Sequence, residues 1–335
     1  MKRVLIDRNK NFYKANLHCH SIKSDGKMTV EELKDHYVAN GYSIIAFTDH
    51  EHLIDNSYLN DDNFLALTAC EIAIKQFPDQ STLKNWAMKV CHLNLYAKDA
   101  HNIDTPCYNS VADHFLNDEI RDLVVHTCGE YERKYSPEGM REIIDICNEK
   151  GFLVAYNHPR WSLENACDYL EYKGLWAVEI YNNECNVNGL YEYDINVYDD
   201  FLRSGERIAC TATDDNHSVK SACGGWTVIN AESLDYASVI DAMEKHNLYA
   251  STGPVIHELY IEDNTATLTF EKGAYAVMST DGRRIKRKDA TSRDGESTVS
   301  FTFDPEKEKY VRFDVVDEYG RRANTCAYFI EKIKN

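Results

Sequence analysis

Near its start the chain reads Asn16-Leu17-His18-Cys19-His20-Ser21-Ile22-Lys23-Ser24-Asp25-Gly26. Side chains alternate along an extended strand, so His18 and His20 share one face while Cys19 points into packing on the other. The Asp25 carboxylate follows five residues later. This spacing predicts a metal site at the point where a strand ends. The alternative interpretation of this stretch alone is a pair of surface histidines before a turn.

The composition is typical of a globular protein with a strong negative charge. The 335 residues include 37 Lys and Arg against 55 Asp and Glu, which gives a net charge of −18 at pH 7. This length suits one barrel-sized domain and a smaller second one. A protein this acidic has no long-range attraction to anionic polymers or lipids. We therefore expect neither a long nucleic acid nor a membrane among its partners.

The cysteine pattern and the apolar runs bear on location. The 11 cysteines are odd in number and include no Cys-x-x-Cys pair, which favours reduced thiols. The first residues lack the apolar run of a signal peptide, and no stretch reaches the ~20 apolar residues that span a bilayer. These patterns predict a cytoplasmic location.

Apolar runs alternate with helical patterns up to about residue 250. Helices are expected to begin at the capping box of Thr29 and Glu32 and at Ser136-Pro137. Strand–helix alternation favours parallel strands in an α/β barrel or a layered sheet. The strands are expected at residues 15–19, 43–48, 63–70, 89–97, 122–126, 151–156, 175–180, 207–212 and 226–229.

The pattern changes after Ser251-Thr252-Gly253-Pro254, where helical periodicity stops. Short alternating segments with turns at Asp281-Gly282 and Tyr319-Gly320 predict a small antiparallel β-sandwich. We therefore expect two domains, a barrel over residues 1–253 and a β-sandwich over residues 254–335.

Histidines and carboxylates follow or occupy the ends of the expected strands. In an α/β barrel these ends meet at one rim, so residues far apart in sequence converge. Imidazole and carboxylate ligands suit Mn²⁺, Zn²⁺ or Fe better than a thiolate site would. The candidates are too many for one ion, and Glu71 is a natural bridge between two, so two to three divalent ions are expected. The candidate ligands are His18, His20, Asp25, His50, Glu71, His92, His158, Asp215 and His217.

Taken in order, these motifs resemble those of the PHP (polymerase and histidinol phosphatase) family over about residues 14–254. The resemblance implies a distorted (β/α)7 TIM-like barrel that holds up to three metal ions. The C-terminal segment looks like that of a PHP subgroup with carbamate and amide hydrolase relatives. The motifs are His18-x-His20 with Ser24-Asp25-Gly26, Thr48-Asp49-His50, Glu71, His92, Asn157-His158-Pro159 and Asp215-x-His217.

The resemblance also implies how the ligands divide among the ions. Histidinol phosphatases of the family carry a histidine where Asp25 stands, so histidinol phosphate is not favoured as substrate. One ion would be held by His18, His20, Glu71 and Asp215, a second by Glu71, His92 and His158, and a third by Asp25, His50 and His217.

Four further residues are candidates for roles beside the metals. His126 follows a strand-like run and is a ligand in place of His92, an acid for the leaving group, or a structural residue. Asp49 either orients a ligand imidazole or caps a turn. Arg160 is expected to bind a phosphate, and Trp161 is expected to stack on a base or sugar. The alternative for Arg160 is a side chain that lies over surface aromatic rings.

Two features are interpreted as structural. His52 is expected to be a loop residue and not a ligand. The basic run Arg283–Lys288 indicates a solvated edge strand of the β-sandwich.

These observations lead to one leading hypothesis and two alternatives. The leading hypothesis is a metal-dependent phosphoesterase that acts on a small phosphorylated substrate, a nucleotide or sugar phosphate, with a metal-bridging hydroxide as nucleophile. The first alternative keeps the metals but hydrolyses a carbamate, ester or amide. The second is a non-catalytic, metal-stabilised binding module.

Overall fold

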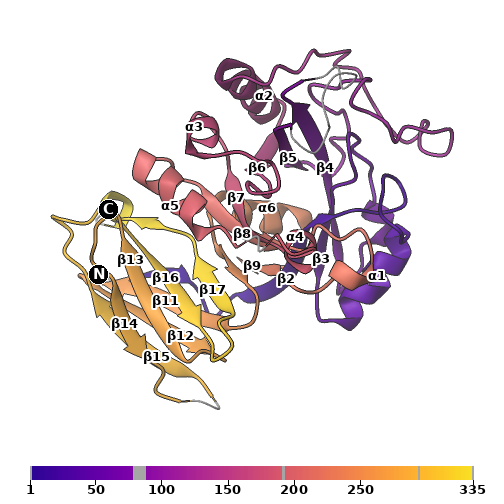
Figure 1. Ribbon diagram of the computed structural model, residues 1–335. Helices are drawn as coiled ribbons and strands as arrows, with labels where there is room; N and C mark the ends of the chain where they lie inside the picture. Colours follow the sequence, from indigo (N-terminus) through magenta and orange to yellow (C-terminus); the bar gives the residue numbers. More distant parts are fainter. Residues whose placement is uncertain (1, 78–87, 191–192, 293–294, 334–335) are drawn as a thin grey trace.

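The computed structural model describes residues 2–77, 88–190, 193–292 and 295–333, and its fold is mixed α/β (Figure 1). One large sheet provides the strands that carry the expected ligands. These strands are β2 (Asn11–Cys19), β3 (Ile44–Phe47), β4 (Leu65–Lys75), β5 (Val90–Ala97), β6 (Phe152–Tyr156), β7 (Ala177–Asn182), β8 (Ala209–Thr213), β9 (Trp226–Ala231) and β10 (Leu248–Ser251).

Short helices connect these strands and cover the sheet. The expected capping box of Thr29 and Glu32 is present, and Ser136 caps the helix that begins at Pro137. The apolar faces of α2, α5 and α6 pack on β6, β7 and β9. The helices are α1 (Val30–Ala39), α2 (Pro137–Glu149), α3 (Ala166–Tyr169), α4 (Asn183–Val187), α5 (Ile195–Ser204), α6 (Tyr236–Glu244) and α7 (Ile330–Ile333), with 3₁₀ turns η1 (Ser57–Leu59) and η3 (Val219–Ser221).

The expectation of uniformly parallel strands was wrong. Strands β2, β3 and β4 are parallel, as are β6, β7 and β8, but β5 is antiparallel to both β4 and β6, and β9 is antiparallel to β2. The reversal arises because β4 continues past the expected end at residue 70 to Lys75, where it pairs with Val90 at the start of β5. The strand expected at 122–126 is not formed; Val125 makes only an isolated bridge to Asp104.

The sheet curls but does not close into the expected barrel. The end of β8 returns beside β2, where Asp215 N donates to His18 O at 2.8 Å and His20 N donates to Asn216 O at 3.2 Å. Across the described ranges, no ladder of strand pairs joins β8 to β2. The two edges therefore meet through an isolated bridge between Cys19 and Asn216, close to the expected site.

The C-terminal part of the chain, after β10, extends the large sheet with antiparallel strands and supplies most of a second sheet. The large sheet continues from β10 to β17 (Arg322–Thr325), β16 (Tyr310–Val316), β13 (Tyr275–Thr280) and β14 (Lys286–Asp289), with β18 (Tyr328–Phe329) beside β16. A second sheet has the order β1 (Lys2–Ile6), β11 (Val255–Glu262), β12 (Thr265–Glu271) and β15 (Ser297–Thr302). As expected of the basic run, β14 is an edge strand and is mostly exposed.

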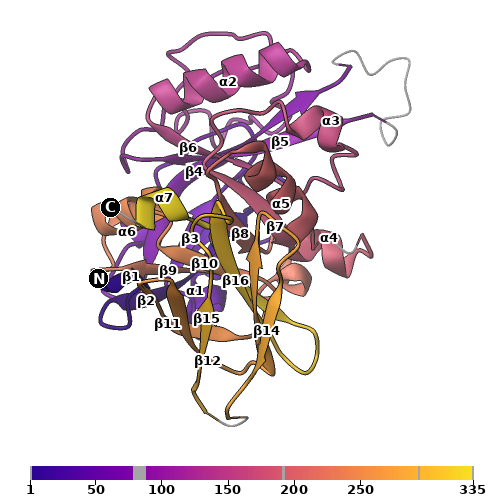
Figure 2. The same ribbon diagram turned by 90° about the vertical axis from the view of Figure 1, so that its left-hand side faces the viewer.

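An apolar core lies between the second sheet and the facing part of the large one (Figure 2). It includes Leu259 and Phe270 from the second sheet and Phe313 from the large one. The N-terminal strand β1 belongs to this unit, and β10 pairs with both β9 and β17, so pairing crosses residue 253 without a break. The β-sandwich domain and the division at residue 253 stay predictions.

The helices are all short. Among the described residues, no helix combines the length and the apolar character needed to cross a bilayer.

Candidate metal centre

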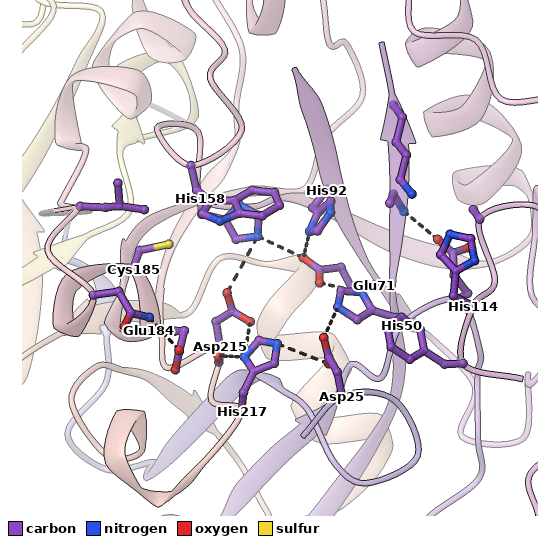
Figure 3. Close-up of a pocket in the computed structure, with 18 residues that line it drawn as sticks. Asp25, His50, Glu71, His92, His114, His158, Glu184, Cys185, Asp215 and His217 are labelled. Atoms are coloured by element: carbon purple, nitrogen blue, oxygen red, sulfur yellow. Dashed lines mark hydrogen bonds and ion pairs between the residues drawn. The ribbon is translucent and has the colours of Figure 1, made fainter. Parts of the chain in front are cut away.

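The opening histidine motif lies as its spacing predicts. His18 and His20 are fully buried at the end of β2, and Cys19 packs on the opposite face against Leu33 and Tyr37 of α1. The other expected ligands converge on the same place from the surrounding strands and loops (Figure 3). All nine candidate ligands fall into three overlapping groups. Glu71 belongs to the first and second groups, and His20 belongs to the first and third.

The first group is His18, His20, Glu71 and Asp215. Asp215 Oδ1 lies 3.2 Å from His18 Nε2 and 3.0 Å from His20 Nε2. Glu71 Oε1 lies 3.2 Å from His18 Nε2. The donor atoms of four residues from three strands or their ends thus face one point.

The second group is Glu71, His92 and His158. Glu71 Oε1 lies 3.0 Å from His92 Nδ1 and 3.2 Å from His158 Nε2. His92 is near the start of β5, and because β5 is antiparallel to β4, its start lies at the same end of the sheet as Glu71. The antiparallel direction of β5 therefore places His92 beside Glu71, whereas the start of a parallel strand would lie at the other end of the sheet.

The third group adds Asp25, His50 and His217 to His20. Asp25 Oδ2 lies 3.4 Å from His50 Nε2, and Asp25 Oδ1 lies 3.3 Å from His217 Nε2. His50 Nδ1 also lies 3.2 Å from Glu71 Oε2. This group is the more open one, because the Asp25 side chain is 37% exposed.

The chemistry of the donors fits divalent metal ions. They are imidazole nitrogens and carboxylate oxygens, the set that Zn²⁺, Mn²⁺ and Fe accept. The Nε2 atoms of His18 and His20 lie only 3.2 Å apart. Two nitrogen lone pairs at this separation need a shared proton or a cation between them.

Close pairing governs the protonation of these groups. Burial alone would lower the pKa of His20, but hydrogen bonds to Asp215 and Glu71 raise it to about 10. Burial would raise the pKa of Asp215, but His18 and His20 hold it well below its ordinary range. Since a ligand imidazole must be deprotonated, protons and a divalent ion compete for the same atoms.

Glu179 positions the first group and was not found by sequence reasoning. Its Oε1 lies 3.0 Å from His18 Nδ1, and its Oε2 accepts hydrogen bonds from His158 N and Asn182 Nδ2, both at 2.9 Å. Asn182 Nδ2 also donates to Asp215 Oδ2 at 3.0 Å. A carboxylate behind a ligand imidazole fixes its ring orientation. The available signal was an acidic residue inside the apolar strand expected at 175–180.

Two candidate ligands have a left-handed backbone. His158 has φ of 24° and Asp215 has φ of 49°. Residues other than glycine seldom adopt this region, and such conformations cluster at functional sites. Each residue lies two positions after the end of a strand, β6 for His158 and β8 for Asp215.

Asp49 holds the turn that carries Asp25. It accepts hydrogen bonds from Ser21 N, Ser21 Oγ and Ser24 Oγ, each at 2.8 Å. These contacts match the turn-capping alternative of the sequence analysis. Gly26 completes the turn, because a Cβ there would lie 2.3 Å from the His20 carbonyl oxygen.

Seven of the nine candidate ligands, all except His18 and His20, line a cavity of about 480 Å³. Trp161 lines it, with its ring centroid 4.9 Å from those of His92 and His158. Arg160 is not among the lining residues; its Nη1 lies 3.5 Å from the Leu190 carbonyl oxygen. The lining residues that sequence reasoning missed include Lys75 and His114.

His126 lies elsewhere. Its ring stacks on Tyr108 with a centroid distance of 3.6 Å, close to His52 and Asp113, and it does not line the cavity. Of the alternatives, the position beside Glu71 is therefore taken by His92.

No protein-family model and no curated protein matches this sequence. Among solved structures, a two-domain protein from Bacteroides vulgatus that contains a predicted PHP-like metal-dependent phosphoesterase is 13% identical, with a TM-score of 0.45 over 98% of this chain and 97% of that one. A lesion-specific endonuclease from Pyrococcus furiosus is 14% identical, with a TM-score of 0.44 over 70% of this chain and 56% of that one.

An amidohydrolase from Chromobacterium violaceum is also similar, at 14% identity and a TM-score of 0.38 over 61% of this chain and 88% of that one. All three similar proteins are hydrolases. TM-scores this low decide neither fold nor activity, so the functional argument rests on the site itself.

Proposed function

We propose that the chain is a PHP-type, metal-dependent phosphoesterase that hydrolyses a small phosphorylated molecule, a nucleotide or sugar phosphate. The observation that carries the proposal is the convergence of nine imidazole and carboxylate side chains in three overlapping groups, seven of which line one cavity. In this proposal the curled sheet is a distorted (β/α)7 barrel and residues 254–335 are a β-sandwich domain. No disulfide joins any of the 11 cysteines, all of which lie among the described residues, and this favours a reducing, cytoplasmic location.

Two to three divalent ions would be held by the three groups, with Glu71 shared between the first and second groups. When bound, such ions polarise phosphoryl oxygens and lower the pKa of water. The chain's own part is to hold the ligands in place before substrate arrives: Glu179 fixes the His18 ring and Asn182 fixes Asp215. Preorganised groups of this kind need no rearrangement during the reaction.

The cavity lining supports a small anionic substrate. At about 480 Å³ the cavity has the size of a site for a small molecule and not for a polymer. Lys75 can supply positive charge, and Trp161 offers a flat surface to a base or sugar. This arrangement also agrees with the net charge of −18, which disfavours long nucleic acids.

One observation favours the carbamate, ester or amide alternative. Lys75 is the one Lys or Arg among the cavity-lining residues that the structure describes. A phosphate site normally gathers several cationic donors. A neutral carbonyl substrate would need none beyond the metals.

A substrate panel tests the proposal. Protein loaded with Mn²⁺ is assayed for phosphate release from phosphomonoesters, phosphodiesters, nucleotides and sugar phosphates. The control is Asp215→Asn, because asparagine tolerates the left-handed backbone while removing the charge. We expect release that falls at least ~100-fold in the control.

The other outcomes separate the alternatives. Turnover of carbamates, esters or amides without phosphate release from fully metallated protein would favour the first alternative. No turnover of either class would leave the metal-stabilised binding module.

A further inference from the structure

A second cluster of ligand-type side chains lies apart from the candidate metal centre. It consists of His52, in the loop after β3, and of Asp113 and His126, both in the long connection between β5 and α2 at residues 98–136. One donor atom from each residue lies within 4.8 Å of the others. None of the three lines the cavity.

The imidazole nitrogens of this cluster are buried and make no hydrogen bond, although His52 Nδ1 lies beside the Asp113 carboxylate. Within the described part of the chain, neither Nδ1 nor Nε2 of His52 has a hydrogen-bond partner, and the same holds for His126. His52 is fully buried. Buried polar atoms are nearly always satisfied, so four unsatisfied nitrogens at one place indicate a ligand that satisfies them.

The carboxylate is held so that one oxygen faces the imidazoles. Asp113 Oδ1 accepts hydrogen bonds from two following backbone amides, at 3.0 and 3.3 Å. Asp113 Oδ2 lies 3.4 Å from His52 Nδ1 and accepts a hydrogen bond from Tyr108 Oη at 3.2 Å. The Tyr108 ring in turn stacks on His126. Asp113 and His126 are therefore each oriented by contacts outside the cluster.

We propose that His52, Asp113 and His126 bind one further divalent transition-metal ion, such as Zn²⁺. Two imidazoles and a carboxylate form a ligand set that such ions take, with the remaining positions left for water. The ion would fasten the connection at residues 98–136 to the loop after β3.

The position of the cluster gives this ion a structural role. Phe115, two residues after Asp113, lines the cavity and stacks on His50 with a centroid distance of 5.2 Å and an interplanar angle of 15°. His50 is in turn two residues before His52. The ion therefore holds one wall of the cavity against the candidate metal centre without taking part in the reaction.

Metal content of the full chain tests this proposal. The protein is stripped with a chelator and reloaded with Zn²⁺, and bound metal is measured by mass spectrometry after circular dichroism has shown each variant to be folded. We expect His126→Gln and Asp113→Asn each to bind one equivalent fewer than the parent. The matched control is His101→Gln, an exposed histidine of the same connection, which should bind as the parent does.

A reciprocal variant keeps the test independent of any single substitution. Combining Glu71→Gln, Asp215→Asn and Asp25→Asn removes a carboxylate from each of the three groups of the candidate metal centre, and this variant should retain one equivalent. Zn²⁺ should also slow hydrogen–deuterium exchange over residues 104–133 in the parent but not in His126→Gln.

The proposal is overturned if His126→Gln binds as many equivalents as the parent, or if the folded triple variant binds none. Because the readout is metal content, a failure of the proposed phosphoesterase activity would leave this result unaffected.

Discussion

Arg133 and Glu51 form a buried, bidentate ion pair, in which Nη1 lies 2.9 Å from Oε1 and Nη2 lies 2.7 Å from Oε2. Their side chains are only 4% and 2% exposed. Glu51 stands between His50 and His52 and has a left-handed φ of 68°. Arg133 also donates to the Ala73 carbonyl oxygen of β4 at 3.0 Å. The pair thus joins the connection at residues 98–136 to the loop that carries a candidate ligand of each cluster.

We predict that Arg133→Leu lowers the free energy of unfolding by about 3–5 kcal/mol, because it leaves the Glu51 carboxylate buried without its partner. Urea unfolding followed by circular dichroism measures the loss. The double variant Glu51→Gln, Arg133→Leu removes both charges and should lose less than Arg133→Leu alone. A double variant that is less stable than the single one would contradict this account.

Much of the site could be predicted because it depends on local rules. The strand period places His18 and His20 on one face, and the order of the motifs indicated the other seven candidate ligands before any contact was known. The turn of Ser24-Asp25-Gly26 has a local cause as well, since only glycine fits against the His20 carbonyl oxygen.

The parts that could not be predicted depend on pairing between distant segments. Nothing in residues 89–97 distinguishes an antiparallel strand from a parallel one; the extension of β4 to Lys75 decides it. Glu179 looks like an ordinary strand residue until His18 is placed beside it. His52 and His126 lie 74 positions apart in sequence and are brought together by a connection with little regular structure. Periodicity carries no information about such a connection.

Glu179 should affect metal affinity more than stability. Glu179→Gln keeps the size of the side chain but weakens its contact with His18 Nδ1, so we expect divalent-metal affinity to fall about 10–100-fold. Isothermal titration calorimetry with Mn²⁺ on metal-free protein measures the change. Glu184→Gln is a suitable control, since Glu184 lines the same cavity but belongs to none of the three ligand groups. Unchanged affinity in Glu179→Gln would show that His18 is oriented without it.

Substitutions of the adjacent residues Trp161 and Arg160 are expected to differ in their effect on KM. Trp161→Ala should raise KM about 10-fold with little change in kcat, because it removes an apolar surface beside His92 and His158 that would cover bound substrate. Arg160→Ala should change KM less, because Arg160 does not line the cavity. Steady-state kinetics on the best substrate of the panel compares the two. A larger rise in KM for Arg160→Ala than for Trp161→Ala would support the role of Arg160 in binding phosphate that the sequence predicts.

Glu164 is a buried carboxyl that three tyrosines surround. Tyr135 Oη donates to its Oε1 and Tyr156 Oη donates to its Oε2, both at 2.6 Å, and Tyr172 Oη donates to Oε1 as well. Burial raises the pKa of Glu164 above its ordinary value of 4.5, and the tyrosine hydrogen bonds offset only part of this rise. The folded chain therefore holds this proton more tightly than the unfolded chain does.

This pKa sets the sign of a pH effect on stability. As pH rises from below 4.5 toward the raised pKa, the unfolded chain releases the Glu164 proton first, so the free energy of unfolding falls by about 1.4 kcal/mol for each unit of pKa difference. Glu164→Gln cannot lose this proton. The stability of the parent relative to Glu164→Gln should therefore decline through this window and become constant above the folded pKa.

Gln also leaves one tyrosine hydroxyl without its carboxylate acceptor, but that cost does not vary with pH. Urea unfolding of both proteins at several pH values isolates the carboxyl, because all other titrating groups are shared. A relative stability that is constant or rises with pH would mean that the tyrosine hydrogen bonds outweigh burial.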